Sequence, residues 1–100
     1  MDITSLTKDV ENISQKYAKK YGIRRDSQWF ILKLQEEMGE LIQSYLMMEG
    51  KGRTKGKTKE QLRNDFHKEL ADVFCHVLLV ANSQKADLEK EVEKKWLKYR

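Results

Sequence analysis

Five acidic residues in two short segments are the side chains best suited to chemistry in this 100-residue chain. The first segment reads Glu36-Glu37-x-x-Glu40 and the second reads Glu69-x-x-Asp72. At about 100° per residue, the two acids of each Glu-x-x-acid pair lie on the same side of a helix, and the first of each pair borders an apolar stripe. Two helices packed antiparallel through those stripes would bring four carboxylates together at their seam.

Four carboxylates at close range in a partly dry setting need neutralisation by protons or cations. Mg²⁺ suits the cluster because it prefers oxygen ligands and binds carboxylates together with substrate phosphates; Mn²⁺ would be a substitute. The cluster contains no histidine or cysteine pair, which disfavours zinc. A di-iron centre is disfavoured because its Glu-x-x-His signature is missing: residue 72 is aspartate, and His76 lies four residues further on.

The alternative is that these acids form ordinary surface ion pairs, for example between Lys33 and Glu36 or Glu37. That interpretation would suffice for a single Glu-x-x-Glu. Two such pairs, both at the edge of an apolar stripe on consecutive helices, favour a site. Glu36 projects farther toward solvent than Glu37. It is therefore expected either to contact the metal ligands without binding the metal itself, or to act as a base that orients a water molecule.

The helices that must position these acids are visible in the apolar spacing. A first helix ends at Gly22, and a second begins at the Asp26-Ser27 cap and runs to about Glu49. Helical spacing of apolar residues supports the first helix at Ile3, Leu6, Val10, Ile13 and Tyr17, and the second at Phe30, Ile31, Leu34, Met38, Leu41, Ile42, Tyr45 and Met48.

A third helix is expected over residues 60–82, and its second half is apolar nearly all round. Such a helix must be central and covered by another subunit as well. Asp87 can cap a short fourth helix whose inner side would carry Leu88, Val92, Trp96 and Tyr99. The expected fold is therefore all-α: a four-helix bundle, one domain over residues 1–100, completed as a homodimer or homotetramer.

Residues 50–59 contain three glycines and five cations without an apolar side chain. They are expected to form a mobile loop outside the core, most simply a solvated linker. The alternative is that these cations attract a polyphosphate.

Composition excludes several classes of protein. The chain is 39% hydrophobic and 36% charged, without proline, so it is not collagen-like or proline-rich. Cys75 is the single cysteine, which excludes an internal disulfide, and it is expected to be a small core residue. No signal sequence or apolar stretch of membrane length is present, so we expect a cytoplasmic protein with no membrane contact. The net charge of +4 is too small to indicate nucleic-acid binding, so we do not expect a nucleic-acid partner.

The acidic motifs resemble those of the MazG-like, all-α nucleoside triphosphate pyrophosphohydrolases. That family carries Glu-Glu-x-x-Glu, a variable spacer and Glu-x-x-Asp, matched here by Glu36, Glu37, Glu40, Glu69 and Asp72 with a long spacer of 28 residues. Residues 33–41 are similar to the family's first motif helix and residues 69–73 to its second. The likeness extends over about residues 27–100.

The resemblance implies hydrolysis of a nucleoside triphosphate to a monophosphate and pyrophosphate, in the service of nucleotide-pool cleaning. It also implies that Glu37, Glu40, Glu69 and Asp72 hold Mg²⁺. Near the C-terminus, Lys95, Lys98 and Arg100 would approach the phosphates, although they could equally favour the last turn of their helix. This chemistry depends on charge neutralisation and in-line placement of water, so no nucleophilic Ser, Cys or His is needed.

Four further residues are candidate substrate contacts with simpler alternatives. Trp29, two turns before Glu37, could stack on a nucleobase or pack in a subunit interface. His76 could contact substrate or hydrogen-bond a carboxylate, and Asn82 could contact ribose or terminate its helix. Lys33 could contact substrate or form a surface ion pair.

A second class of function competes with the enzyme. In that alternative, the chain is a helical nucleic-acid-binding or interaction module that uses the basic loop and the lysine-rich C-terminus. Its binding would weaken steeply with salt, and it would have no reason to bind Mg²⁺ at the helical seam.

Overall fold

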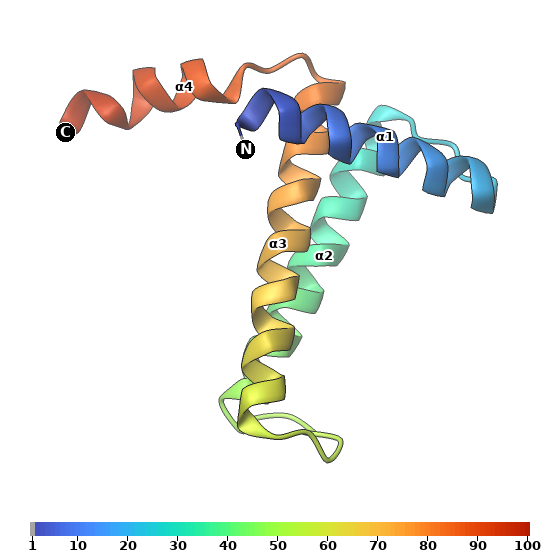
Figure 1. Cartoon of the computed structure of the whole chain (residues 1–100), viewed down its shortest axis with the longest axis vertical. Coiled ribbons are helices and arrows are strands. Elements are labelled where there is room, and N and C mark those ends of the chain that lie inside the picture. Colours follow the sequence, from blue (N-terminus) through green and yellow to red (C-terminus); the bar gives the residue numbers. More distant parts are fainter. Residues whose placement is uncertain (1) are drawn as a thin grey trace.

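The computed structural model describes residues 2–100, which form four α-helices and a terminal 3₁₀ helix, with no strand among them (Figure 1). The elements are α1 (Ile3–Tyr21), α2 (Ser27–Met48), α3 (Lys59–Ser83), α4 (Leu88–Lys95) and η1 (Leu97–Tyr99). The predicted all-α class and the number of helices are confirmed.

The helix ends follow the capping chemistry of the sequence. Asp26 and Asp87 accept hydrogen bonds from backbone N–H groups at the starts of α2 and α4, and Gly22 closes α1 in the left-handed conformation at φ +65°. Thr58 and Gln61 form a reciprocal capping box, so α3 begins one residue earlier than expected.

An antiparallel pair of long helices, α2 and α3, forms the body of the molecule, and α1 crosses its upper end (Figure 1). The buried apolar side chains lie mostly where these three helices meet: Ala18, Phe30, Leu62, Leu78, Leu79 and Ala81. The pairing of α2 with α3 places both acidic segments on facing helices, as the apolar stripes predicted.

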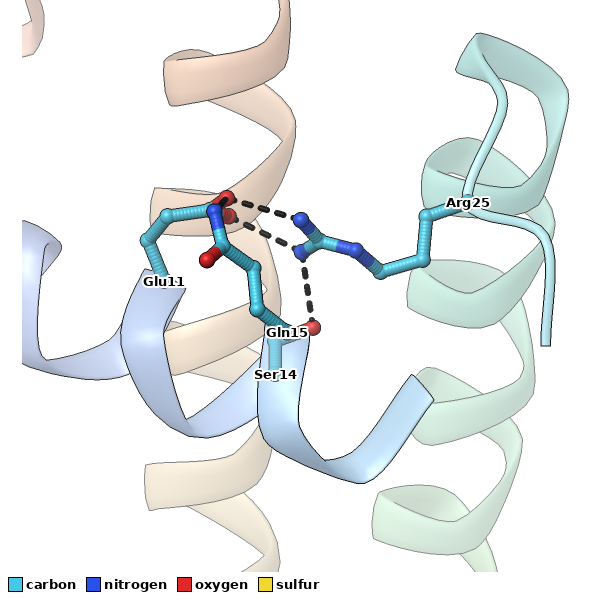
Figure 2. A network of polar contacts seen from close by, with 4 residues as sticks. All are labelled: Glu11, Ser14, Gln15 and Arg25. Carbon is cyan, nitrogen blue, oxygen red and sulfur yellow. Dashed lines mark hydrogen bonds and ion pairs between the residues drawn. The ribbon is translucent and has the colours of Figure 1, made fainter. Parts of the chain in front are cut away.

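A polar contact that the sequence analysis did not foresee fixes α1 (Figure 2). Arg25, between α1 and α2, donates two hydrogen bonds to the Glu11 carboxylate, at 2.9 and 2.7 Å, and a third to the Ser14 hydroxyl at 3.0 Å. Its guanidinium also lies over the Phe30 ring, 5.1 Å from the ring centre. This forked contact orders the connection and holds α1 beside the α2–α3 pair.

The expectation that the fourth helix packs by an inner apolar side is wrong for the single chain. No residue of α4 is buried, Val92 is exposed, and Trp96 and Tyr99 are 69% and 79% exposed. The link to α3 passes through Lys85 at φ +57°, and α4 then leads away from the helix pair (Figure 1).

The chain alone is more extended than an ordinary domain of its length. Its radius of gyration is 15.9 Å, against about 13 Å for a compact 100-residue domain. Over the residues that the structure describes, no helix combines the length and apolarity required of a membrane span.

One face of the α2–α3 pair exposes large apolar side chains. We call it the outer apolar face; it consists of Ile31, Met38 and Ile42 of α2 and Leu70 and Phe74 of α3. Leu70 and Phe74 are 44% and 45% exposed. At about 100° per residue, the residues through which α2 and α3 pack lie between these five apolar residues and the acidic residues. The apolar and acidic residues are therefore on opposite faces of the helix pair. Within one chain, α3 therefore buries only part of its apolar surface and leaves the rest exposed to solvent.

Candidate metal centre

Three glutamates from the two facing helices meet in a groove on the other face of the pair. Glu37 and Glu40 come from α2 and Glu69 from α3, and each offers a carboxylate oxygen within 4.8 Å of the other two. Glu37 is only 8% exposed, Glu69 is half-buried and Glu40 is exposed. The cluster therefore has a dry inner side and an open outer side.

Two carboxylate oxygens of the cluster are buried without a hydrogen-bond donor, namely one oxygen of Glu37 and one of Glu69. A buried carboxylate that accepts no hydrogen bond is costly, because nothing replaces its lost hydration. A divalent cation bound between the two helices would satisfy both oxygens, so the donor set fits an oxygen-preferring metal ion.

The electrostatics of the cluster agree with that fit. Burial, followed by the neighbouring Glu40 carboxyl and the charge of Asp72, raises the pKa of Glu37 to about 7. Burial and the charges of Asp72 and Glu40 also raise the pKa of Glu69. In the absence of a cation, the cluster therefore holds a proton on Glu37 near neutral pH.

Asp72, the fourth expected ligand, is exposed and lies outside the group of three. Asp72 lies about 60° of helix rotation from Glu69 toward solvent, as Glu40 does from Glu37, so this rotation alone does not distinguish the two acids. The charge of Asp72 nevertheless contributes to the raised pKa values of Glu37 and Glu69. The structure thus assembles three of the four acids and leaves Asp72 at the rim.

Above the cluster, the groove widens into a cavity of about 420 Å³, which we call the aromatic cavity. Its lining comes from α1, α2 and α3: Val10, Ile13, Ser14, Tyr17, Trp29, Lys33, Glu37, Asp72, Cys75, His76 and Leu79. Trp29 and Lys33 therefore share one space with two of the acids, Glu37 and Asp72. Ile13 and Tyr17 were expected to pack as part of a helix stripe, but they face this cavity.

His76 lies in the aromatic cavity with its Nε2 atom 3.8 Å from a Glu37 oxygen. That separation is too long for a hydrogen bond. Burial, and then the charge of Lys33, lowers the pKa of His76, so the ring is neutral at pH 7. Its Nδ1 atom is buried without a partner. The predicted alternative, a hydrogen bond from His76 to a carboxylate, is not formed here.

Lys33 and Glu36 form the surface pair that was considered as the alternative to a site. The Lys33 ammonium lies 3.4 Å from both Glu36 carboxylate oxygens, and Glu36 is exposed. Glu37, one residue further, belongs to the buried cluster instead. The surface-pair interpretation is therefore confirmed for Glu36, whereas Glu37 lies in the carboxylate cluster.

Below the cluster lies a second cavity, also of about 420 Å³, which we call the lysine cavity. Its lining comes from α2, the 49–58 loop and α3: Glu40, Gln43, Ser44, Met47, Lys55, Lys57, Asp65, Lys68 and Glu69. The loop was expected to be a solvated linker, with attraction of a polyphosphate by its cations as the alternative, and Lys68 was not among the predicted contacts. The available signal was the i, i+4 spacing of Lys68 and Asp72, which places a cation one helical turn from the second acid of the motif.

Several expected substrate residues are not brought to the groove within one chain. Asn82 lines a different cavity, of about 270 Å³, together with residues of α1 and the start of α4. Lys95, Lys98 and Arg100 belong to the C-terminal segment that leads away from the helix pair (Figure 1) and line neither groove cavity. Cys75 is half-buried and lines the aromatic cavity, and burial raises the pKa of its thiol.

Comparisons of this chain with protein-family models, with curated proteins and with solved structures find no match.

Proposed function

We propose that this chain is a Mg²⁺-dependent nucleoside triphosphate pyrophosphohydrolase, which converts a triphosphate and water to a monophosphate and pyrophosphate. The observation that carries the proposal is the Glu37–Glu40–Glu69 cluster, with its two buried and unpartnered carboxylate oxygens. The resemblance of the acidic motifs to MazG-like enzymes supplies the reaction class.

In this proposal, Glu37, Glu40 and Glu69 hold Mg²⁺, with Mn²⁺ as a substitute, and Asp72 contributes from the rim. When bound, such an ion neutralises phosphate charge and lowers the pKa of a coordinated water. The chain's own contribution is to hold the carboxylates on two packed helices. Their positions are set by the α2–α3 core before substrate arrives.

The aromatic cavity is the proposed nucleoside site. Trp29 offers a flat apolar surface to a base, while the neutral His76 offers ring nitrogens for hydrogen bonding. Lys33 places a cation at the same cavity beside the cluster. Glu36, at the exposed edge of α2, stays our prediction for the residue that orients the attacking water.

Oligomerisation is part of the proposal. Burial of the outer apolar face against a second copy would complete the core, as a homodimer or homotetramer. Lys95, Lys98 and Arg100 project from the single chain, so we propose that they reach phosphates bound to another subunit.

The proposal is tested by incubating the protein with a panel of ordinary and modified nucleoside triphosphates and measuring pyrophosphate release. Release should require Mg²⁺ and should fall by at least about 100-fold in Glu37→Gln/Glu69→Gln. Mutation of residues that merely hydrogen-bond metal ligands lowers activity by about 10- to 100-fold, and loss of the ligands themselves should lower it further. A charge-matched control, Glu49→Gln/Glu60→Gln, changes exposed acids outside both groove cavities and should retain activity. Equal release by both double variants would contradict the assignment.

The competing nucleic-acid-binding function makes a different prediction in the same samples. It predicts salt-sensitive binding of an oligonucleotide that is unaffected by Glu37→Gln/Glu69→Gln, together with no binding of Mg²⁺ to the groove.

A further inference from the structure

The lysine cavity has a charge balance that changes when a cation binds to the cluster. Its lining includes three lysines, Lys55, Lys57 and Lys68, and three acids, Glu40, Asp65 and Glu69. Two of those acids belong to the proposed metal centre. With Glu40 and Glu69 committed to a divalent ion, the cavity would carry a surplus of positive charge.

The three lysines are not equivalent. Lys57 donates to the Asp65 carboxylate at 2.7 Å, which ties the loop back to α3. Lys55 and Lys68 form no ion pair with any residue that the structure describes. They are therefore the two cations of this cavity without a carboxylate of their own.

A tight turn in the loop brings Lys55 to the lining of this cavity. The Lys57 N–H donates to the Thr54 carbonyl at 3.0 Å, and both central residues of that turn, Lys55 and Gly56, have positive φ. Positive φ at both central positions is the pattern of a type I′ turn. The capping box at Thr58 then starts α3 directly after the turn. The basic segment 50–59 is thus folded against the groove at its centre.

Along α2, the groove presents three environments in order. Trp29 marks the aromatic cavity, Glu37 and Glu40 mark the carboxylates, and Met47 lies in the lysine cavity. At 1.5 Å per residue, Trp29 and Met47 are about 27 Å apart along the helix axis. An aromatic end, an acidic centre and a cationic end match, in the same order, a nucleoside, metal-bound phosphates and further anionic phosphates.

We propose that the lysine cavity is a polyphosphate-binding site that holds the terminal phosphates of the substrate, and hence the departing pyrophosphate, through Lys55 and Lys68. The proposal rests on the proposed function for the identity of the substrate. In this proposal the substrate binds along the groove in one orientation, with its nucleoside toward α1 and its leaving pyrophosphate toward the 49–58 loop. Lys57 acts as a positioning residue, because its ion pair with Asp65 holds the loop in place.

The test is calorimetric titration of the full chain with inorganic pyrophosphate in the presence of Mg²⁺. Lys55→Gln/Lys68→Gln leaves the Lys57–Asp65 ion pair intact, and we expect it to weaken binding by at least about tenfold, as loss of two charge-assisted contacts requires. The matched control is Lys51→Gln/Lys59→Gln, which removes the same charge from exposed positions outside the cavity. It should change the affinity by less than about twofold, because only general attraction is lost. Equal losses in the two variants, or no loss in either, would overturn the proposal.

A titration with Mn²⁺ alone separates this proposal from the proposed function. Wild type and Lys55→Gln/Lys68→Gln should bind Mn²⁺ with the same affinity. If wild type bound no Mn²⁺, the metal-dependent function would be wrong, whereas a selective loss of pyrophosphate binding in the lysine variant would still support the cavity. If Mn²⁺ bound normally and pyrophosphate binding ignored the two lysines, only the polyphosphate site would be wrong.

Discussion

The two faces of the α2–α3 pair are incomplete in opposite ways. The groove face buries charge, because Glu37 and Glu69 each hold an oxygen with no protein donor. The outer apolar face exposes large side chains such as Leu70 and Phe74. In the proposed function, the first face binds a cation and the second binds another copy of the chain. A change on one face should then leave the binding at the other largely unaffected.

The largest effect should come from placing a charge on the outer apolar face. Phe74→Glu would bury an unpaired carboxylate in any interface formed there, so we expect its self-association constant to fall by at least about 100-fold. Sedimentation velocity over a concentration series measures this. Asn64→Glu, which adds the same charge at an exposed position of α3, is the matched control and should assemble as wild type. If the wild-type protein remained monomeric at micromolar concentration, the outer apolar face would not be an interface between copies of the chain.

Changing the groove face should have two effects of opposite sign. Glu37→Gln removes a buried charge, so the metal-free protein should become more stable at pH 8 by about 1–2 kcal/mol. The same change should weaken Mg²⁺ binding by about 100-fold, since a ligand is lost. Thermal unfolding with and without Mg²⁺ measures both effects. Glu36→Gln breaks only an exposed pair with Lys33, so its effect on stability should be below about 0.5 kcal/mol. Destabilisation of the metal-free protein by Glu37→Gln would mean that Glu37 has a protein partner.

The pH dependence should follow from the pKa of Glu37, which burial and Glu40 raise to about 7. The folded chain keeps a proton that the unfolded chain releases near the ordinary carboxyl pKa of about 4.3. The free energy of unfolding of the metal-free protein should therefore decrease as pH rises from about 4 to about 7, and then level off. Mg²⁺ affinity should change in the other direction, rising by up to about tenfold per pH unit below 7. Glu37→Gln should flatten both profiles, and an unchanged slope in that variant would assign the titration to another group.

The smallest effect on metal binding should come from breaking the contact that positions α1. Arg25→Ala removes the forked bond to Glu11 and the bond to Ser14, so we expect a loss of about 1–3 kcal/mol in the free energy of unfolding. Chemical denaturation measures it. Because α1 lines the aromatic cavity but contributes none of the three glutamates, Mn²⁺ affinity should remain within about twofold of wild type. Loss of Mn²⁺ binding in Arg25→Ala would show that the groove is not independent of α1.

The helices and the acidic cluster were predictable because they depend on local rules. Capping by Asp26 and Asp87, the left-handed Gly22 and the apolar spacing set the helix ends, and helical periodicity placed Glu37, Glu40 and Glu69 toward one seam.

Other features depend on the conformation of the segments that connect the helices, which the spacing of apolar residues does not predict. Arg25 reaches back 14 residues to Glu11 from a non-helical segment, and the 50–59 loop folds a lysine against the groove. The direction of α4 is set by a link with one residue, Lys85, at positive φ. Periodicity also makes Asp72 equivalent to Glu40, since each lies about 60° of helix rotation from the first acid of its pair, yet only Glu40 joins the group of three.

The central claim is that the groove is completed by a divalent cation held between α2 and α3. Anomalous diffraction from crystals soaked in Mn²⁺ tests it directly. We expect an anomalous peak in the groove, coordinated by oxygens of Glu37, Glu40 and Glu69 and absent from crystals of Glu37→Gln/Glu69→Gln. Ordered carboxylates that turn away from one another with no peak between them would contradict it.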